Sequence, residues 1–198
     1  MKLYGIYHPQ AITMKKILAG VVIYFCVFAS HSASAQCGTE RWDVKILNDA
    51  EADDINFTKV SSTVHKQLAF TKPAYHENNP RDATEKRVYK LNCKLIKYKE
   101  EDDKDWHLIV QDMTTNEQMV VEIPSLACID QSNPRFSKID VSRKRLKAQV
   151  GPVTKDYRLP PAGTRLQIIG VGFFDKSNHP AGFKGRELHP VLELKVLQ

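Results

Sequence analysis

Apolar and polar residues alternate along five stretches of the chain after residue 86. Side chains two positions apart on a β-strand share one face of the sheet, so this period predicts half-buried strands. The apolar positions fall into five groups, in chain order: Tyr89, Leu91, Cys93 and Leu95; Trp106, Leu108 and Val110; Met119, Val121 and Ile123; Leu166, Ile168, Gly170 and Gly172; and Leu188, Pro190, Leu192, Leu194 and Val196. Turn-forming residues separate the groups, so we expect five short strands joined by loops.

A helical period replaces this alternation between the third and fourth stretches. Asn133 followed by Pro134 is typical of a helix start, since Asn caps the helix and Pro suits its first position. One apolar stripe then runs along the predicted helix, formed by Phe136, Ile139, Leu146 and Val150. A stripe of this spacing predicts an amphipathic helix that packs on a core.

The order of these elements predicts the fold class. Three strands, a helix and two strands (β-β-β-α-β-β) is the order of the OB-fold, a small five-stranded Greek-key barrel. A ferredoxin-like sandwich would need helices alternating with strands, and the pattern shows one strong helix after residue 86. We therefore expect a mainly β protein with one main helix, in which residues 86–198 form an OB-fold-like barrel.

The region before the barrel has too few apolar residues to bury a core of its own. Residues 41–50 alternate like a strand, and residues 61–70 predict a short helix capped at Ser61 or Ser62. We expect residues 36–85 to form an N-terminal arm or lid that lies on the barrel.

The first 35 residues have the three parts of a secretory signal peptide. Lys15 and Lys16 form the basic part, residues 17–29 the apolar part, and residues 33–35 an A-x-A cleavage site, so Met14 is the expected start. An uncleaved membrane anchor is the alternative, but the apolar run is shorter than the roughly 20 residues that a span needs. We expect a secreted or periplasmic protein with no membrane span after cleavage.

Cleavage changes the charge balance of the chain. It removes three lysines and no acidic residue, so 29 basic residues become 26 against 23 acidic ones, and the formal net charge falls from +6 to +3. This excess is too small to indicate nucleic-acid binding by itself. The one basic patch lies on the predicted helix, at residues 143–147, where we expect a solvated helix face.

Three cysteines remain after cleavage, and export makes a disulfide plausible. Cys93 shares its strand face with apolar residues, so it is expected to be a small buried side chain. Cys37 and Cys128 both lie in polar, irregular sequence, which favours a disulfide between them. A bond between Cys93 and Cys128 is the alternative.

Two charged loops suggest where an activity would lie. In an OB-fold the loop between strands one and two meets the loop between strands four and five at one side of the barrel. These loops and the strand residues beside them place six candidate ligand-binding or metal-binding residues together: Asp105, His107, Asp175, His179, Glu187 and His189. His107 and His189 are expected to point away from the apolar faces of their strands. Glu122 is expected to pair with Lys97 or His107 across strands.

This residue set permits two kinds of chemistry. Carboxylates and imidazoles can bind a divalent metal ion, the one cofactor that the pattern suggests, or can act as acid and base. The chain has no HExxH, paired CxxC or EF-hand motif that would specify a metal site. An ordinary solvated turn at residues 100–105 is the structural alternative.

Five short blocks resemble a group of uncharacterised secreted bacterial proteins. They are CGTERW, DWHLIV, EIPSLAC, GVGFFD and ELHPVL, in that order, and the resemblance that they carry extends over nearly all of the chain after residue 36. The resemblance implies export and a compact β-rich domain, and it implies no particular activity.

Three functions fit the pattern. The leading one is a single-domain binding protein, monomeric and without turnover, that takes a small ligand or a protein through the loops at one side of the barrel. A metal-dependent hydrolase of nuclease type on the same barrel is the alternative, and an exported structural protein without a discrete site is the second alternative. Nucleic acid is a poor ligand because the first loop is acidic where nucleic-acid-binding barrels collect Lys and Arg.

Overall fold

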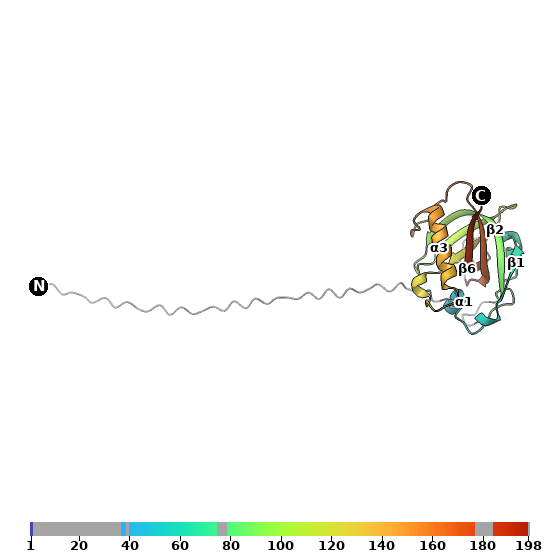
Figure 1. The fold of residues 1–198 in the computed structure, drawn as a ribbon, viewed down its shortest axis with the longest axis horizontal. Helices are drawn as coiled ribbons and strands as arrows, with labels where there is room; N and C mark the ends of the chain where they lie inside the picture. Colours follow the sequence, from blue (N-terminus) through green and yellow to red (C-terminus); the bar gives the residue numbers. More distant parts are fainter. Residues whose placement is uncertain (2–36, 39, 75–78, 177–183, 198) are drawn as a thin grey trace. The chain divides into compact units, whose positions relative to one another are not determined.

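The computed structural model describes residues 1, 37–38, 40–74, 79–176 and 184–197, and all the helices and strands discussed below lie after residue 40 (Figure 1). Five strands form a closed barrel: β2 (Arg87–Glu100), β3 (Trp106–Asp112), β4 (Gln118–Ile123), β5 (Arg165–Phe174) and β6 (Arg186–Leu197). Their order around the barrel is β2-β3-β4-β6-β5, and β5 pairs again with β2. This closed order, with one main helix between β4 and β5, confirms the predicted OB-fold-like barrel.

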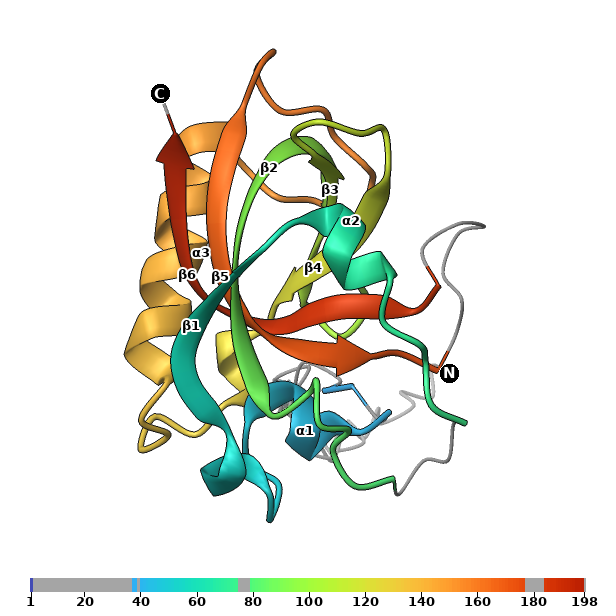
Figure 2. The ribbon, with the colours of Figure 1, turned by 90° about the vertical axis from the view of Figure 1, so that its right-hand side faces the viewer.

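Two features of strand pairing close the barrel. The 14-residue strand β2 pairs with β5 through Val88–Lys94 and with β3 through Cys93–Glu100, and its register shifts between Leu95 and Lys97. Such a shift bends a strand, so one long strand serves two sides of the barrel. β4 and β6 pair in parallel, which requires a crossover connection, and α3 (Phe136–Val150) lies within it. Figures 1 and 2 both show α3 beside β6.

The barrel interior is apolar and fully enclosed. Residues at alternate positions of the five strands fill it, and Ile139 and Leu146 of α3 are completely buried against them. Cys93 lies in this core with no exposed surface, as predicted, and burial raises the pKa of its thiol to about 12. A thiol in such surroundings is chemically unreactive and contributes to the packing of the core.

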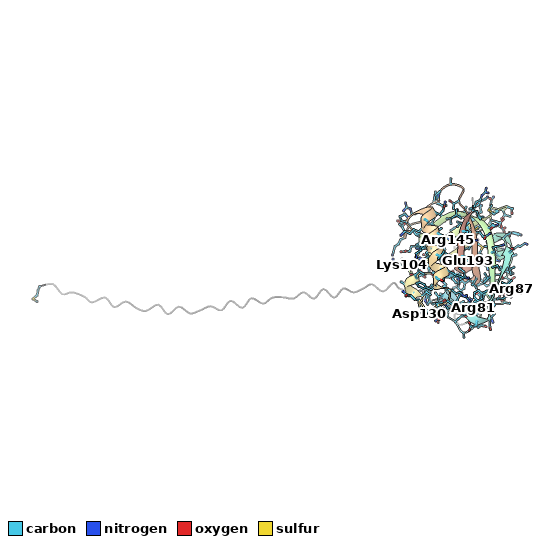
Figure 3. The ribbon with its side chains drawn as sticks, in the orientation of Figure 1. Arg81, Arg87, Lys104, Asp130, Arg145 and Glu193 are labelled. Atoms are coloured by element: carbon cyan, nitrogen blue, oxygen red, sulfur yellow. A yellow bond between two sulfur atoms is a disulfide. The ribbon has the colours of Figure 1, made fainter. Side chains whose placement is uncertain are left out.

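The basic patch on α3 is partly engaged with the barrel. Arg143 donates hydrogen bonds from its guanidinium to the backbone carbonyls of Ile123 and Pro124, and it stacks on the Trp106 ring at 3.9 Å from the centroid. Arg145 donates to the carbonyl of Leu194 at 3.2 Å. Figure 3 labels Arg145 beside Glu193 of β6, and both side chains line one groove. The prediction of a solvated helix face is therefore correct for Lys144 and Lys147, which are exposed, whereas Arg143 and Arg145 hold the helix on the barrel.

The segment before the barrel differs from its pattern in two places. Residues 42–46, predicted as a strand, form the one-turn helix α1 (Trp42–Ile46). Arg41 and Leu47 take left-handed backbone conformations at φ 44° and 59° and turn the chain sharply on both sides. Three alternating apolar residues are too few to specify a strand when no neighbouring strand is there to pair with them.

A sixth strand, β1 (Asn56–Ser62), was not predicted. It pairs in parallel with β2 outside the barrel and is mostly exposed, so its sequence shows no apolar alternation. The helix predicted in residues 61–70 is present as α2 (Val64–Leu68), but the predicted cap is wrong because Ser61 and Ser62 belong to β1. Thr63 is the cap, and its side chain accepts a hydrogen bond from the Lys66 N–H at 3.1 Å. Two short 3-10 helices complete the described elements, η1 (Ala52–Asp54) and η2 (Leu126–Cys128).

The predicted disulfide joins Cys37 to Cys128, across 91 residues of sequence, and Cys93 is a free thiol. The bond ties the start of the described chain to η2, beside the barrel. The predicted signal peptide at residues 1–35 lies outside the described residues, apart from Met1. Among the helices that the structure describes, none has both the length and the apolar composition needed to cross a membrane.

We expect the Cys37→Ser/Cys128→Ser double variant to lose about 2–4 kcal/mol of unfolding free energy, because the bond closes a long loop in the unfolded chain. Urea unfolding of oxidised protein would measure the loss. Cys93→Ser, which removes a thiol outside the bond, provides the control for disulfide mapping: its unreduced digest should still contain the peptide that links residues 37 and 128. A digest of the unaltered protein in which Cys93 is the main cross-linked residue would contradict the assignment.

Candidate functional site

Three ionisable side chains lie in one row across the outer face of the barrel. His107 on β3 is directly opposite Glu122 on β4. Strand β6 pairs in parallel with the other side of β4. Val120 lies opposite Glu187 and Val121 opposite Leu188, so the next residues in this register are Glu122 and His189. Residues at paired positions share a face and their side chains are in contact range, so the strand register alone assembles this row.

Glu122 lies between the two histidines. Its Oε1 is 2.7 Å from Nδ1 of His107, and its Oε2 is 3.1 Å from Nδ1 of His189. Burial alone would raise the pKa of Glu122, but the interactions with both imidazoles hold it well below its usual range. Glu122 is therefore a carboxylate in the folded protein, and it is the central group of the site.

Asp105 approaches the row from the turn before β3. Its Oδ2 is 3.3 Å from Nε2 of His189, and its Oδ1 accepts a hydrogen bond from the Ser125 N–H at 2.7 Å. Lys104, at φ 69°, gives this turn its left-handed step, and Glu101 and Asp105 close it through a backbone hydrogen bond of 2.9 Å. Asp105 is completely buried, so this part of the acidic loop is not a solvated turn.

His189 is surrounded by carboxylates. Burial would lower the pKa of its imidazole, but Asp105, Glu122 and Glu187 raise it well above the usual value. The distance from Nδ1 of His189 to the Glu187 carboxylate is 3.8 Å. The Phe173 ring also lies against the His189 ring, with the two centroids 5.6 Å apart.

More carboxylates lie around this centre. We call the whole group the barrel-end cluster, and it contains Glu40, Glu101, Asp103, Asp105, Glu122, Asp175 and Glu187 together with Lys45, His107 and His189. Lys45 is brought in by α1, and its ammonium lies 5.4 Å from the centroid of the Phe173 ring. Burial would lower the pKa of Lys45, but Glu122, Glu187 and Asp175 raise it above its ordinary value.

Two of the outer carboxyl groups hold protons more tightly than usual. Burial, a hydrogen bond with Asp175 and the charge of Asp175 raise the pKa of Glu40 to about 7. Burial and the charge of Glu122 raise the pKa of Glu187. Both shifts have the same cause, namely that several negative charges share a space with little water.

The structure brings together four of the six residues predicted from the sequence: Asp105, His107, Glu187 and His189. Asp175 belongs to the same cluster through its interactions with Glu40 and Lys45. His179 lies in residues 177–183, outside the described residues. The two histidines do point away from the apolar faces of their strands, but they are only 3% and 0% exposed. The Tyr157 ring, which follows α3 in the chain, lies against His107 with ring centroids 6.1 Å apart, and α1 packs against β6, the strand of His189.

Five members of the cluster were not among the predicted site residues: Glu40, Lys45, Glu101, Asp103 and Glu122. Glu122 was expected only as a cross-strand partner, and its pairing with His107 was one of the two pairings predicted. Lys45 and Glu40 had no signal in the sequence, because the helix that presents Lys45 read as a strand. For Glu101 and Asp103, the acidic loop at residues 100–105 was the only signal.

The raised pKa of Glu40 predicts that the free energy of unfolding decreases as the pH rises. A carboxyl whose pKa is higher in the folded protein than in the unfolded one binds more protons when folded, so the stability that it contributes is lost as the pH rises from about 4.5 to about 7. Glu40→Gln, which imitates the protonated form, should flatten this slope. Urea unfolding at several pH values from 5 to 8 would measure it, and equal slopes for the two proteins would contradict the assignment.

Comparison with known proteins assigns no family to this chain. No protein-family model matches it, and no curated protein matches it. Among solved structures, a chain of Entamoeba histolytica asparaginyl-tRNA synthetase is similar over 56% of this chain, with 11% sequence identity and a TM-score of 0.33. The match spans 20% of that chain's length. The resemblance to secreted bacterial proteins stays a prediction, and the OB-fold-like barrel is established by the strand order itself.

Proposed function

We propose that this protein is an exported, single-domain binding protein that takes a small cationic ligand at the barrel-end cluster, without turnover. The observation that supports this most directly is the composition of the cluster. Seven carboxyl groups gather there, and the basic side chains facing them are Lys45, His107, His189, Lys99 (which pairs with Glu101 at 3.0 Å) and Arg143 near Asp105. A cationic ligand would complete the charge balance.

The energetic argument rests on burial. Asp105, Glu122 and Glu187 are each less than a tenth exposed, and moving a carboxylate out of water is costly unless a positive group compensates it. Part of the repulsion is relieved by protons, as the pKa of about 7 at Glu40 indicates. A bound cation would replace that relief at neutral pH and would stabilise the folded state.

The disulfide supports the exported location. Disulfides form and persist in oxidising compartments, and the Cys37–Cys128 bond agrees with the signal peptide predicted from the first 35 residues. The same cluster argues against nucleic acid, whose phosphates would meet carboxylates at the end of the barrel.

A thermal-shift panel tests this function. Divalent metal ions and putrescine represent small cations, and phosphate and citrate represent anions. At a ligand concentration of about 100 times Kd, mass action adds about 2.7 kcal/mol, which corresponds to a rise in melting temperature of roughly 5–10 °C for a domain of this size. We expect at least one class of cation to produce such a rise and the anions to produce none.

Paired variants make the result specific to the cluster. Glu187→Gln removes a buried carboxylate of the cluster, and Glu193→Gln removes a partly exposed one on the same strand, where it pairs with Lys59 at 3.0 Å. The shift should shrink in the first variant and persist in the second. The proposed function would be contradicted if an anion stabilised the protein, or if none of the ligands in the panel did.

A further inference from the structure

We propose that the cation is a divalent transition-metal ion of the zinc class, bound by Asp105, Glu122 and His189. This inference rests on the proposed function and names the ligand of the same site. It commits to a ligand set of two carboxylates and one imidazole, in which His107 orients Glu122 without binding the metal.

The spacing of the three groups suits a small divalent ion. One ligand atom from each residue lies within 4.8 Å of the others, and the contact between Nε2 of His189 and Oδ2 of Asp105 is 3.3 Å. Zinc binds nitrogen and oxygen at about 2.0–2.2 Å in a tetrahedron, which places its ligand atoms roughly 3.3–3.6 Å apart. The Asp105 contact with Nε2 already has this spacing, whereas the Glu122 carboxylate lies beside Nδ1 and would have to move toward an ion on Nε2.

A second observation, independent of the acidity, points to a missing partner. Both ring nitrogens of His189 and Oδ2 of Asp105 are buried, and none of the three makes a hydrogen bond among the described residues. The imidazole lies close to carboxylate oxygens, but not in the directions that its N–H groups require. Buried polar atoms are nearly always hydrogen-bonded. A metal ion would give a partner to Oδ2 of Asp105 and to one ring nitrogen of His189, and the other nitrogen, which keeps its proton, lies close to a carboxylate oxygen.

The remaining oxygens of the two carboxylates are already held in place. The Ser125 N–H holds Oδ1 of Asp105, which leaves Oδ2 directed at His189. His107 holds Oε1 of Glu122, which leaves Oε2 directed at His189. Metal sites typically have such outer partners, which fix the orientation of each ligand. His107 is thus a positioning residue.

The chemistry of the donors selects the class of metal. Mg²⁺ and Ca²⁺ prefer sites made of oxygen atoms alone, whereas an imidazole with carboxylates suits Zn²⁺ and its neighbours Mn²⁺, Fe²⁺ and Co²⁺. Three protein ligands also leave one position for a water molecule or a small ligand. The proposed ion would therefore be held firmly and would still be able to bind a further group.

Isothermal titration of oxidised, chelator-treated protein with Zn²⁺ tests the site, and Co²⁺ provides a spectroscopic readout because its visible absorption reports tetrahedral coordination. We expect one equivalent of Zn²⁺ to bind. His189→Gln should weaken binding by more than the roughly 10- to 100-fold that the loss of an outer partner costs. His65→Gln is the matched control, since His65 forms a His–Glu pair of the same 2.7 Å length with Glu117 on the surface.

Two further variants keep the test informative if His189→Gln folds poorly. Asp105→Asn and Glu122→Gln change charge and leave shape almost unaltered, and each should lower the affinity for Zn²⁺ in protein whose circular dichroism is unchanged. His107→Ala should weaken binding by roughly 10- to 100-fold, and His107→Asn should restore it in part, because the Asn amide can donate to Glu122 in place of Nδ1. If His107 had only a structural role, replacing it would not change the visible absorption of bound Co²⁺.

The outcomes separate this inference from the proposed function. If putrescine or Ca²⁺ stabilises the protein and Zn²⁺, Mn²⁺ and Co²⁺ do not bind, the metal site is overturned and the cation-binding function stands. If Zn²⁺ binds with unchanged affinity in the variants of Asp105, Glu122 and His189, the assignment of the ligands is overturned. If no cation binds, both proposals fail.

Discussion

The double pairing of β2 is the constraint on which the rest of the structure depends. One half of this strand hydrogen-bonds to β5 and the other half to β3, with a shift of register between Leu95 and Lys97. Because β2 reaches both neighbours, the five strands close on themselves and leave no unpaired edge in the barrel. Closure then fixes the register of β3, β4 and β6, and with it the row of His107, Glu122 and His189.

The segment before the barrel determines the environment of that row. It packs against β6 and adds Lys45 from α1 and Glu40 from the preceding turn, while Tyr157, which follows α3, lies against His107. The bond from Cys37 to Cys128 ties the start of this segment to the barrel. Burial changes what the side chains can do, because charges interact more strongly once water is excluded.

A second buried ion pair shows what a purely structural arrangement looks like in this protein. The guanidinium of Arg41 donates to both oxygens of Glu85, at 2.7 and 3.0 Å. The same two oxygens also accept hydrogen bonds from the Phe174 and Asp82 N–H groups, each at 2.8 Å. Every oxygen of Glu85 is thus satisfied. Oδ2 of Asp105 and the ring nitrogens of His189 make no hydrogen bond among the described residues, which is the observation behind the proposed ligand at the barrel end.

The sequence by itself determined the barrel and its main helix, and it favoured the disulfide that the structure contains. Strand alternation and helix period are local patterns, and they were long and regular enough after residue 86 to specify the element order and therefore the side of the barrel where two charged loops meet. The polarity around the cysteines separated buried Cys93 from the pair that bonds. By contrast, only the tertiary structure decided that α1 is a helix, that β1 adds a sixth strand and that Glu122 is the centre of the site. These features depend on contacts between segments far apart in the chain: an outward-pointing histidine is exposed or buried according to whether another segment covers it, and no local pattern at residue 107 or 189 records that cover.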